Sequence, residues 1–403
     1  MRLVAFSAEY LSLDAALPFG LRDASGRLLL GAGVRIANAD GLQRLRAQPL
    51  FADEADAEAW QRRVAAAMDA RLRRNVALKE VLRARPDDAA LRADAAPAEV
   101  ELGDAWAALS TQLDAATRAA PGADWLPRVR ALQARALALV RRRPDASLYR
   151  LVRAAGEAQP LYCAQHALLV LAVADEAARL LDWDEPARGR LALAALTMNA
   201  TIAALQDRLA LGWHRPTAAQ RAAIAAHADE AAQWLQRAGA DDAVWIEAVR
   251  HHHASAGANA LPAAQPLAQL LQRVDVYTAK ISARRVRPAL SPVQAARDAC
   301  LGRDGAPDAI GAALLRATGL YPPGTVVELA SGERGLVVAR GRRANLPWVA
   351  SLVAPSGLAL GEPALRDTLD ARHAVRAALP AAELKVRPDD ERLLALYRPP
   401  APH

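Results

Sequence analysis

The chain has 403 residues, of which 53% are hydrophobic and 4% aromatic, and its formal net charge is +7. This length predicts two or three domains, and the low aromatic content and modest charge argue against a nucleic-acid polymer as partner. The two cysteines form no CxxC pattern, and the N-terminus lacks the pattern of a signal peptide. No uncharged apolar run reaches about 18 residues. We therefore expect a cytoplasmic protein without a disulfide framework or a membrane span.

The N-terminal third is expected to hold a small β-rich unit over residues 1–52 and a helical segment with a linker over 53–144. In the first unit, two apolar runs flank Asp23-Ala24-Ser25-Gly26, a turn-forming cluster that predicts a hairpin. A long helix with acids in its first turn follows, and then a proline- and acid-containing linker. Two further helices are expected around residues 105–119 and 126–143.

The remaining chain divides into a helical domain over residues 145–320 and a β extension with a C-terminal tail over 321–403. The helical domain has few glycines, and alanine favours helix throughout it. In the extension, two β-branched runs flank residues 330–333, which predicts a second hairpin, and residues 347–353 could add a third strand. The expected fold class is mainly α, with a small β unit at each end.

Histidines are concentrated in the helical domain. Six of the eight lie between His166 and His253, and of these only His214 lies in a Gly/Pro-flanked loop. A single histidine on a helix is more often a surface or hydrogen-bonded core residue than a ligand. Clustering favours a metal site, because imidazole is the commonest neutral ligand. Both interpretations stay open from the residues alone.

Five segments in order resemble one family. Residues 252–262 read HHASAGANALP, against a family pattern H-H-E-x-x-D-G-x-G-Y-P. Residues 274–298, with the segments around His166 and His227 and the hairpin after residue 319, agree in order and spacing. Residues 145 to about 353 thus resemble the HD-GYP domain, the bacterial cyclic di-GMP phosphodiesterase class of the HD superfamily. The resemblance implies an HD-type helical bundle.

The sequence departs from that pattern where the family carries out its chemistry. The family's eponymous His and Asp are Met198 and Asn199, its lysine is Ile202, and the glutamate after the paired histidines is Ala254. A bridging carboxylate places negative charge between two metal ions, which a neutral amide does not. A thioether suits Fe or Mn poorly. The departures imply a degenerate member, for which no residue is assigned a catalytic role.

The resemblance also implies which metal ligands remain. The surviving positions are His166 and Asp275 for a first ion and His227, His252 and His253 for a second. Three histidines can hold one divalent ion of the Fe, Mn or Zn class. The alternative is a polar pocket of hydrogen-bonded histidines without a metal.

Arg284 and Arg287 match basic positions that contact the ligand phosphates in the family. Their i, i+3 spacing would place both on similar sides of a helix. Arginine suits phosphate through its planar fork of donors. The alternative is a solvated basic helix end. His251 has no counterpart in the family and is expected at the surface.

Three functions follow from the resemblance. The first is a degenerate HD-GYP protein in cyclic di-GMP signalling that acts as a nucleotide sensor or as a scaffold for protein partners. The second is an active metal-dependent cyclic di-GMP phosphodiesterase that uses the remaining ligands. The third is a pure interaction module like the HDOD domains, which binds neither metal nor nucleotide. The retained arginines favour a binder, and the loss at Met198 and Asn199 disfavours the enzyme.

Overall fold

The structure is a computed structural model whose chain forms two compact units, Met1–Ala108 and Leu109–His403. It describes residues 3–73, 101–253, 261–301 and 305–397, apart from 12, 14–16, 18, 32–33, 35, 37–38, 120–121, 123 and 307. Within these residues the protein is mainly helical, with one four-stranded and one five-stranded sheet. The predicted fold class, mainly α with two small β parts, is confirmed.

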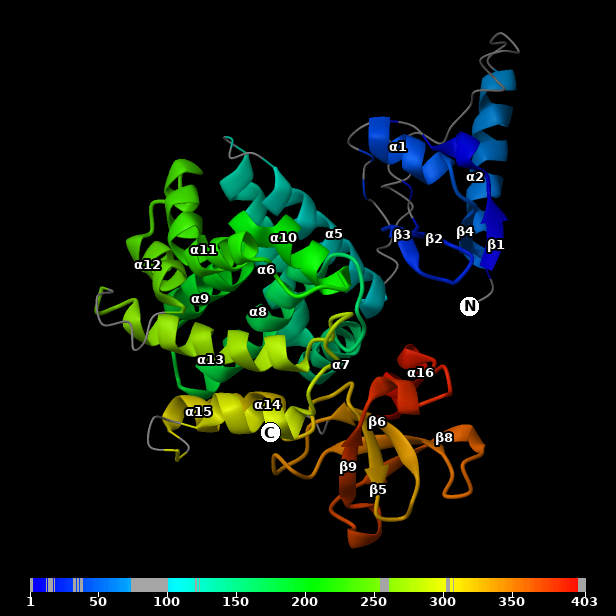
Figure 1. Ribbon diagram of the computed structural model, residues 1–403. Coiled ribbons are helices and arrows are strands. Elements are labelled where there is room, and N and C mark those ends of the chain that lie inside the picture. Colours follow the sequence, from blue (N-terminus) through cyan, green and yellow to red (C-terminus); the bar gives the residue numbers. More distant parts are fainter. Residues whose placement is uncertain are drawn as a thin grey trace. The chain divides into compact units, whose positions relative to one another are not determined.

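The first unit is built on an antiparallel sheet of order β1-β4-β2-β3. The predicted hairpin joins β2 and β3: Gly26 adopts a positive φ of 85°, and the Asp23 carboxylate accepts hydrogen bonds from the backbone of Ser25 and Arg27. The elements, shown in blue in Figure 1, are β1 (Leu3–Phe6), a 3-10 turn (Ala8–Tyr10), β2 (Leu21–Arg22), β3 (Leu28–Leu30), α1 (Ala39–Arg46), β4 (Leu50–Asp53) and α2 (Glu54–Arg73).

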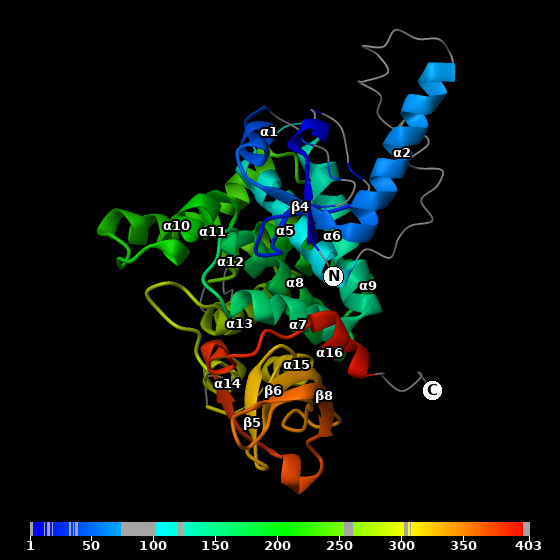
Figure 2. The same ribbon diagram turned by 90° about the vertical axis from the view of Figure 1, so that its right-hand side faces the viewer.

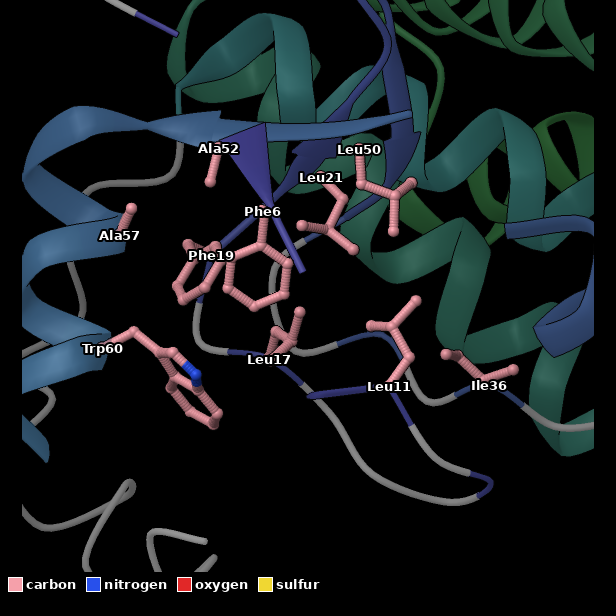
Figure 3. Close-up of a cluster of buried hydrophobic side chains, with 10 residues drawn as sticks. All are labelled: Phe6, Leu11, Leu17, Phe19, Leu21, Ile36, Leu50, Ala52, Ala57 and Trp60. Atoms are coloured by element: carbon pink, nitrogen blue, oxygen red, sulfur yellow. The ribbon is translucent and has the colours of Figure 1, made fainter. Parts of the chain in front are cut away.

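An aromatic cluster forms the core of this unit. The rings of Phe6 and Phe19 meet edge to face with centroids 5.4 Å apart, and Phe19 meets Trp60 of α2 in the same way at 5.9 Å. Such geometry brings the positive ring edge to the negative face. Figure 3 shows the aliphatic side chains that complete this cluster, which come from the sheet, the loops and α2: Leu11, Leu17, Leu21, Ile36, Leu50, Ala52 and Ala57.

The second unit begins with a helical bundle around α8, which runs through its middle in both views (Figures 1 and 2). Residues 167–174 of α8 are buried on every side, because their sequence ALLVLAVA is apolar all round. The helices are α5 (Leu102–Arg118), α6 (Trp125–Arg142), α7 (Pro144–Ala155), α8 (Tyr162–Leu180), α9 (Glu185–Thr197), a 3-10 turn (Ala200–Ile202), α10 (Ala203–Leu211), α11 (Ala218–Arg237), α12 (Ala243–His251), α13 (Gln265–Ile281), α14 (Pro292–Cys300) and α15 (Ala309–Thr318).

Capping side chains lie at the start of α11 and α12, which lead to the histidine cluster, and at the start of α14. Thr217 heads α11 and Ser291 heads α14, each in a capping box with a glutamine three residues later. Asp242 heads α12 and accepts hydrogen bonds from the backbone N–H groups of Val244 and Trp245. These side chains satisfy donors that the first helical turn leaves unpaired.

The five-stranded sheet has the order β8-β7-β6-β5-β9 and is antiparallel throughout. It lies beside the α7 end of the bundle in both views, and Tyr149 of α7 belongs to its core (Figures 1 and 2). The elements are β5 (Val326–Leu329), β6 (Arg334–Ala339), β7 (Trp348–Val353), β8 (Ala359–Asp367), a 3-10 turn (Ala371–His373), β9 (Val375–Leu379), a 3-10 turn (Ala381–Glu383) and α16 (Asp390–Leu396).

The hairpin predicted at residues 330–333 and the strand predicted at 347–353 are both present as β5–β6 and β7. The finer division of the chain at residues 52, 144 and 320 remains a prediction. Most of the expected linker before α5 lies outside the described residues. No helix in the described part of the chain is long and apolar enough to cross a membrane.

Candidate metal and anion site

The five residues expected as metal ligands come from four helices of the second unit. His166 lies on α8, His227 on α11 and Asp275 on α13, whereas His252 and His253 follow the end of α12. The expectation that the paired histidines lie on a helix is wrong, because α12 ends at His251. In the turn, the rings of His252 and His253 lie with their centroids 4.0 Å apart. Successive side chains on a helix point about 100° apart, which would separate the rings further.

The tautomers of His227 and His252 are fixed by the backbone. Nδ1 of His227 lies 2.6 Å from the carbonyl oxygen of Ile224, and Nδ1 of His252 lies 2.6 Å from that of Val249. A carbonyl oxygen only accepts, so each Nδ1 carries the hydrogen. Each neutral ring is therefore left with a lone pair on Nε2.

These two Nε2 atoms face each other at 3.3 Å. Two lone pairs at this distance repel unless a proton or a cation lies between them. Burial, reinforced by the charge of His253, lowers the pKa of His252 to about 3, and burial also lowers the pKa of His227. Protonation is therefore unfavourable at neutral pH, and the arrangement fits a cation.

The spacing fits a metal ion held by imidazole nitrogens. Two Zn–N bonds of about 2.0–2.1 Å at a tetrahedral angle separate the nitrogens by about 3.3–3.4 Å. One ring nitrogen from each of His227, His252 and His253 lies within 4.8 Å of the others. The hydrogen bonds from Nδ1 to carbonyl oxygens are the second contacts that orient metal-ligating histidines. These three histidines could hold a metal ion; His227 and His252 are buried, and His253 is exposed.

His166 and Asp275 instead contact each other directly. Nε2 of His166 lies 2.7 Å from Oδ1 of Asp275, and the ring and carboxylate are both largely buried. Burial raises the pKa of Asp275, but the hydrogen bond and charge of His166 outweigh it and lower this pKa to about 2. Asp275 thus supplies a negative charge whose influence reaches His227 and His252.

The neutral residues expected in place of the family's His, Asp and Lys are all buried. Met198, Asn199 and Ile202 lie where α9 passes into the 3-10 turn, and at most 4% of each is exposed. Among the described residues, no hydrogen-bond partner is present for Nδ2 of Asn199. A buried amide without a partner is unfavourable by about 1–3 kcal/mol.

Arg284 and Arg287 do not lie on a helix, so their predicted helical placement is wrong. Helix α13 ends at Ile281, and the two arginines exchange backbone hydrogen bonds across a tight turn. Ser282 at the C-cap is extended, and Pro288 further disfavours helical backbone at Arg287. We call residues 284–287 the arginine loop.

The side chains of the arginine loop contact neutral groups. Arg284 donates to the Tyr162 hydroxyl at 2.9 Å, with its guanidinium over the ring. Arg287 donates to the carbonyl oxygens of Ala279 and Ser282 at the end of α13. Burial and the charge of Arg284 lower the pKa of Arg287.

Tyr162 connects the arginine loop to the buried His166–Asp275 pair. Its ring stacks on that of His166 with centroids 5.8 Å apart and an interplanar angle of 4°. The sequence contained a signal for this contact, because Tyr162 and His166 are four residues apart on one helix and so share a face. Without the structure, nothing indicated that Arg284 completes the stack.

Other sequence expectations have separate outcomes. His251 is not an isolated surface residue: its Nε2 lies 3.1 Å from the Glu247 carboxylate on the preceding turn. His214 lies in a loop, as expected. The expected replacements at Ala254 and Ala260 lie outside the described residues.

No family model and no curated protein matches this sequence. Among solved structures, the chain is similar to Bd1817, described as an HDG"Y"P protein from Bdellovibrio bacteriovorus. The TM-score is 0.43 and the identity 14%, over 78% of this chain and 98% of that one. A likeness at this TM-score carries no conclusion about this chain.

Proposed function

We propose that this protein is a degenerate HD-GYP-like protein that binds cyclic di-GMP as a sensor or scaffold and is impaired as a phosphodiesterase. A single divalent ion at His227, His252 and His253 accompanies the nucleotide site. The ligand phosphates are bound by Arg284 together with its neighbours in the arginine loop.

The observation that carries the proposal is the unbalanced charge of the arginine loop. Arg284, Arg285 and Arg287 lie within four residues, and none forms an ion pair with an acidic side chain of the described chain. Many other arginines of the second unit are paired, as Arg188 is with Asp175 at 2.9 Å. Three adjacent cations without counter-charges favour an anionic ligand, and guanidinium groups suit phosphate.

The residues at the former catalytic positions argue against efficient hydrolysis. When bound, a metal ion can polarise a phosphoryl oxygen and lower the pKa of a water. Asn199 supplies no negative charge to hold a second ion, and Ile202 supplies no cation to the phosphate. Loss of one oriented electrostatic contributor often lowers the rate about 10²–10³-fold. The remaining residues can bind and orient an anion without these contributions.

An active metallophosphodiesterase is the second candidate, and one observation favours it. The facing Nε2 atoms of His227 and His252 keep the lone-pair geometry of a metal site. A mononuclear site with three imidazoles can support hydrolysis in other folds. This candidate requires turnover, which distinguishes it from the sensor.

One experiment separates the candidates: metal analysis of the purified protein combined with calorimetric titration of cyclic di-GMP and chromatography of the products. We expect nucleotide binding with no more than one ion per chain and without conversion to the linear dinucleotide. Turnover with two or more ions per chain would overturn the proposal. Absence of both metal and nucleotide binding would favour a pure interaction module.

A control variant for the nucleotide arm is available on α14, the helix that follows the arginine loop. Arg284→Ala removes a guanidinium held over Tyr162, whereas Arg297→Ala removes one on α14. We expect the first change to weaken cyclic di-GMP binding by about tenfold or more, since charge-assisted hydrogen bonds contribute about 1.5–3 kcal/mol. Arg297→Ala should leave the affinity unchanged.

A further inference from the structure

Trp213 is the most unusual exposed side chain near the arginine loop. It lies between α10 and α11, directly after Gly212 ends α10, and 69% of its surface is exposed. A tryptophan contributes most to stability when its large apolar surface is buried. The placement of this ring in solvent favours a contact with something outside the chain.

The ring of Trp213 is held beside the arginine loop. The guanidinium of Arg285 lies over it, 4.8 Å from the ring centroid. The backbone N–H of Arg285 donates to the carbonyl oxygen of Ala210 at 2.8 Å, which fixes the loop to the end of α10. Trp213 and Arg285 therefore form a stacked pair of planar groups at the surface.

A second stacked pair adjoins the first through the chain. Arg284, the residue before Arg285, lies over Tyr162, which in turn stacks on His166. The two pairs place one exposed aromatic ring and one buried one next to consecutive guanidinium groups. A ligand that meets both pairs needs a planar ring and an anionic group, the two parts of a nucleotide.

We propose that Trp213 and Arg285 form a stacking platform for the nucleobase of a nucleotide whose phosphate is bound by Arg284. The inference rests on the proposed function, because it places the base of the ligand that the arginine loop binds. Bases stack on aromatic rings and on guanidinium planes alike. The histidine site takes no part in this platform.

The platform selects for a base rather than for a phosphate. Stacking depends on the π surface of the ligand, so a purine gains more than a ligand without a ring. Arg285 contributes both to stacking on the base and to binding of the phosphate, since its guanidinium is planar and charged. Trp213 contributes only to the base. Its removal should therefore separate nucleotide affinity from anion affinity.

The test uses the full chain and two probes, cyclic di-GMP and inorganic pyrophosphate, titrated by calorimetry. Trp213→Ala should weaken cyclic di-GMP binding by about 5- to 100-fold and leave pyrophosphate binding unchanged. Trp213→Phe, which keeps a ring, should recover most of the affinity. Leu358→Ala provides a matched control, because Leu358 is 72% exposed in the loop between β7 and β8.

Two outcomes contradict the inference and remain distinguishable from failure of the proposed function. Equal cyclic di-GMP affinity in Trp213→Ala and the parent chain would overturn the platform while leaving the nucleotide site intact. Absence of cyclic di-GMP binding by the parent chain would overturn both. Circular dichroism of each variant checks the fold, which an exposed side chain should not affect.

Discussion

At the scale of single residues, two backbone carbonyls determine what the histidine cluster can bind. Ile224 and Val249 each accept a hydrogen from Nδ1 of the histidine three residues later. This contact leaves both Nε2 lone pairs directed at a shared point. A histidine whose Nδ1 instead carried the lone pair would leave a hydrogen on Nε2 and could not be a ligand there.

The first prediction concerns His252. His252→Ala removes a buried ligand, and we expect zinc affinity to fall by more than the 10- to 100-fold that loss of an outer contact costs. His251→Ala is the matched control, since His251 is adjacent in the chain but pairs with Glu247. Isothermal titration with Zn²⁺ measures both. Equal losses in the two variants would exclude the three-histidine site.

The second prediction concerns Met198 and Asn199. Met198→His with Asn199→Asp should increase the number of metal ions bound per chain, because it restores an imidazole and a carboxylate at buried positions. Without metal, the added carboxylate is buried near Asn199's present position and should lower the melting temperature. Metal analysis and thermal unfolding with and without Mn²⁺ test both effects. Unchanged uptake would mean that these positions no longer face the histidines.

The residues of the site and their division into two groups followed from the resemblance, but the contacts within each group did not. Histidine clustering indicated His166, His227 and the pair at 252–253. Spacing along the chain could not show that Nε2 of His166 lies in hydrogen-bond contact with the carboxylate of Asp275, 109 positions away. Trp213 gave no signal at all, because exposure of an aromatic side chain depends on the folded surface.

At the scale of elements, α12 carries the paired histidines at its C-terminal end and depends on Asp242 at its start. Asp242 accepts hydrogen bonds from Val244 and Trp245 and from Nε of Arg190 at 2.8 Å. Burial raises the pKa of Asp242, but these hydrogen bonds outweigh it and lower this pKa below its usual value. A lowered pKa means that the ionised form stabilises the fold above pH about 4. That contribution is lost as the pH falls through the folded-state pKa.

The third prediction follows from this cap. Asp242→Ala should lower the free energy of unfolding by about 1 kcal/mol at pH 7, and Asp242→Asn by less, because asparagine also caps. The difference between Asp242→Ala and the parent chain should begin to shrink below pH about 4, where the carboxylate of the unfolded parent chain becomes protonated, and should shrink further as the pH falls through the lowered pKa of the folded state. Urea denaturation at pH 7 and pH 3 measures it. A deficit independent of pH would show that the carboxylate charge is unimportant.

Prediction of helices and strands from the sequence succeeded where the pattern of apolar residues and the turn-forming residues indicate the same element. The two hairpins were found because β-branched or leucine runs flank turn residues such as Gly26 and Gly332, both at positive φ. Strand β8 gave a weak pattern, since ALGEPALRD contains a proline and is mostly polar or small. The arginine loop was assigned to a helix because the i, i+3 spacing was weighed without Pro288.

At the scale of the whole molecule, hydrogen bonds join residues that lie near opposite ends of the second unit's sequence. The Tyr149 hydroxyl of α7 donates to Oδ1 of Asp390 at 2.7 Å, and Arg150 donates to Oδ2 at 2.6 Å. Asp390 begins α16, whose Leu393 and Leu394 are buried in the sheet core together with Tyr149. The contact therefore attaches both α16 and the sheet to the bundle.

The fourth prediction tests this attachment by a double-mutant cycle. Tyr149→Phe and Asp390→Asn each remove part of the network while keeping the side-chain shape. We expect the losses in free energy of unfolding to be non-additive by about 0.5–3 kcal/mol, as for residues that share a buried hydrogen bond. The control cycle pairs Asp390→Asn with Tyr321→Phe, because Tyr321 packs against the separate cluster of Val327, Leu329, Val337 and Val349. Its losses should add. Equal coupling in both cycles would mean that the changes act through a general loosening of the sheet and not through the bond between α7 and α16.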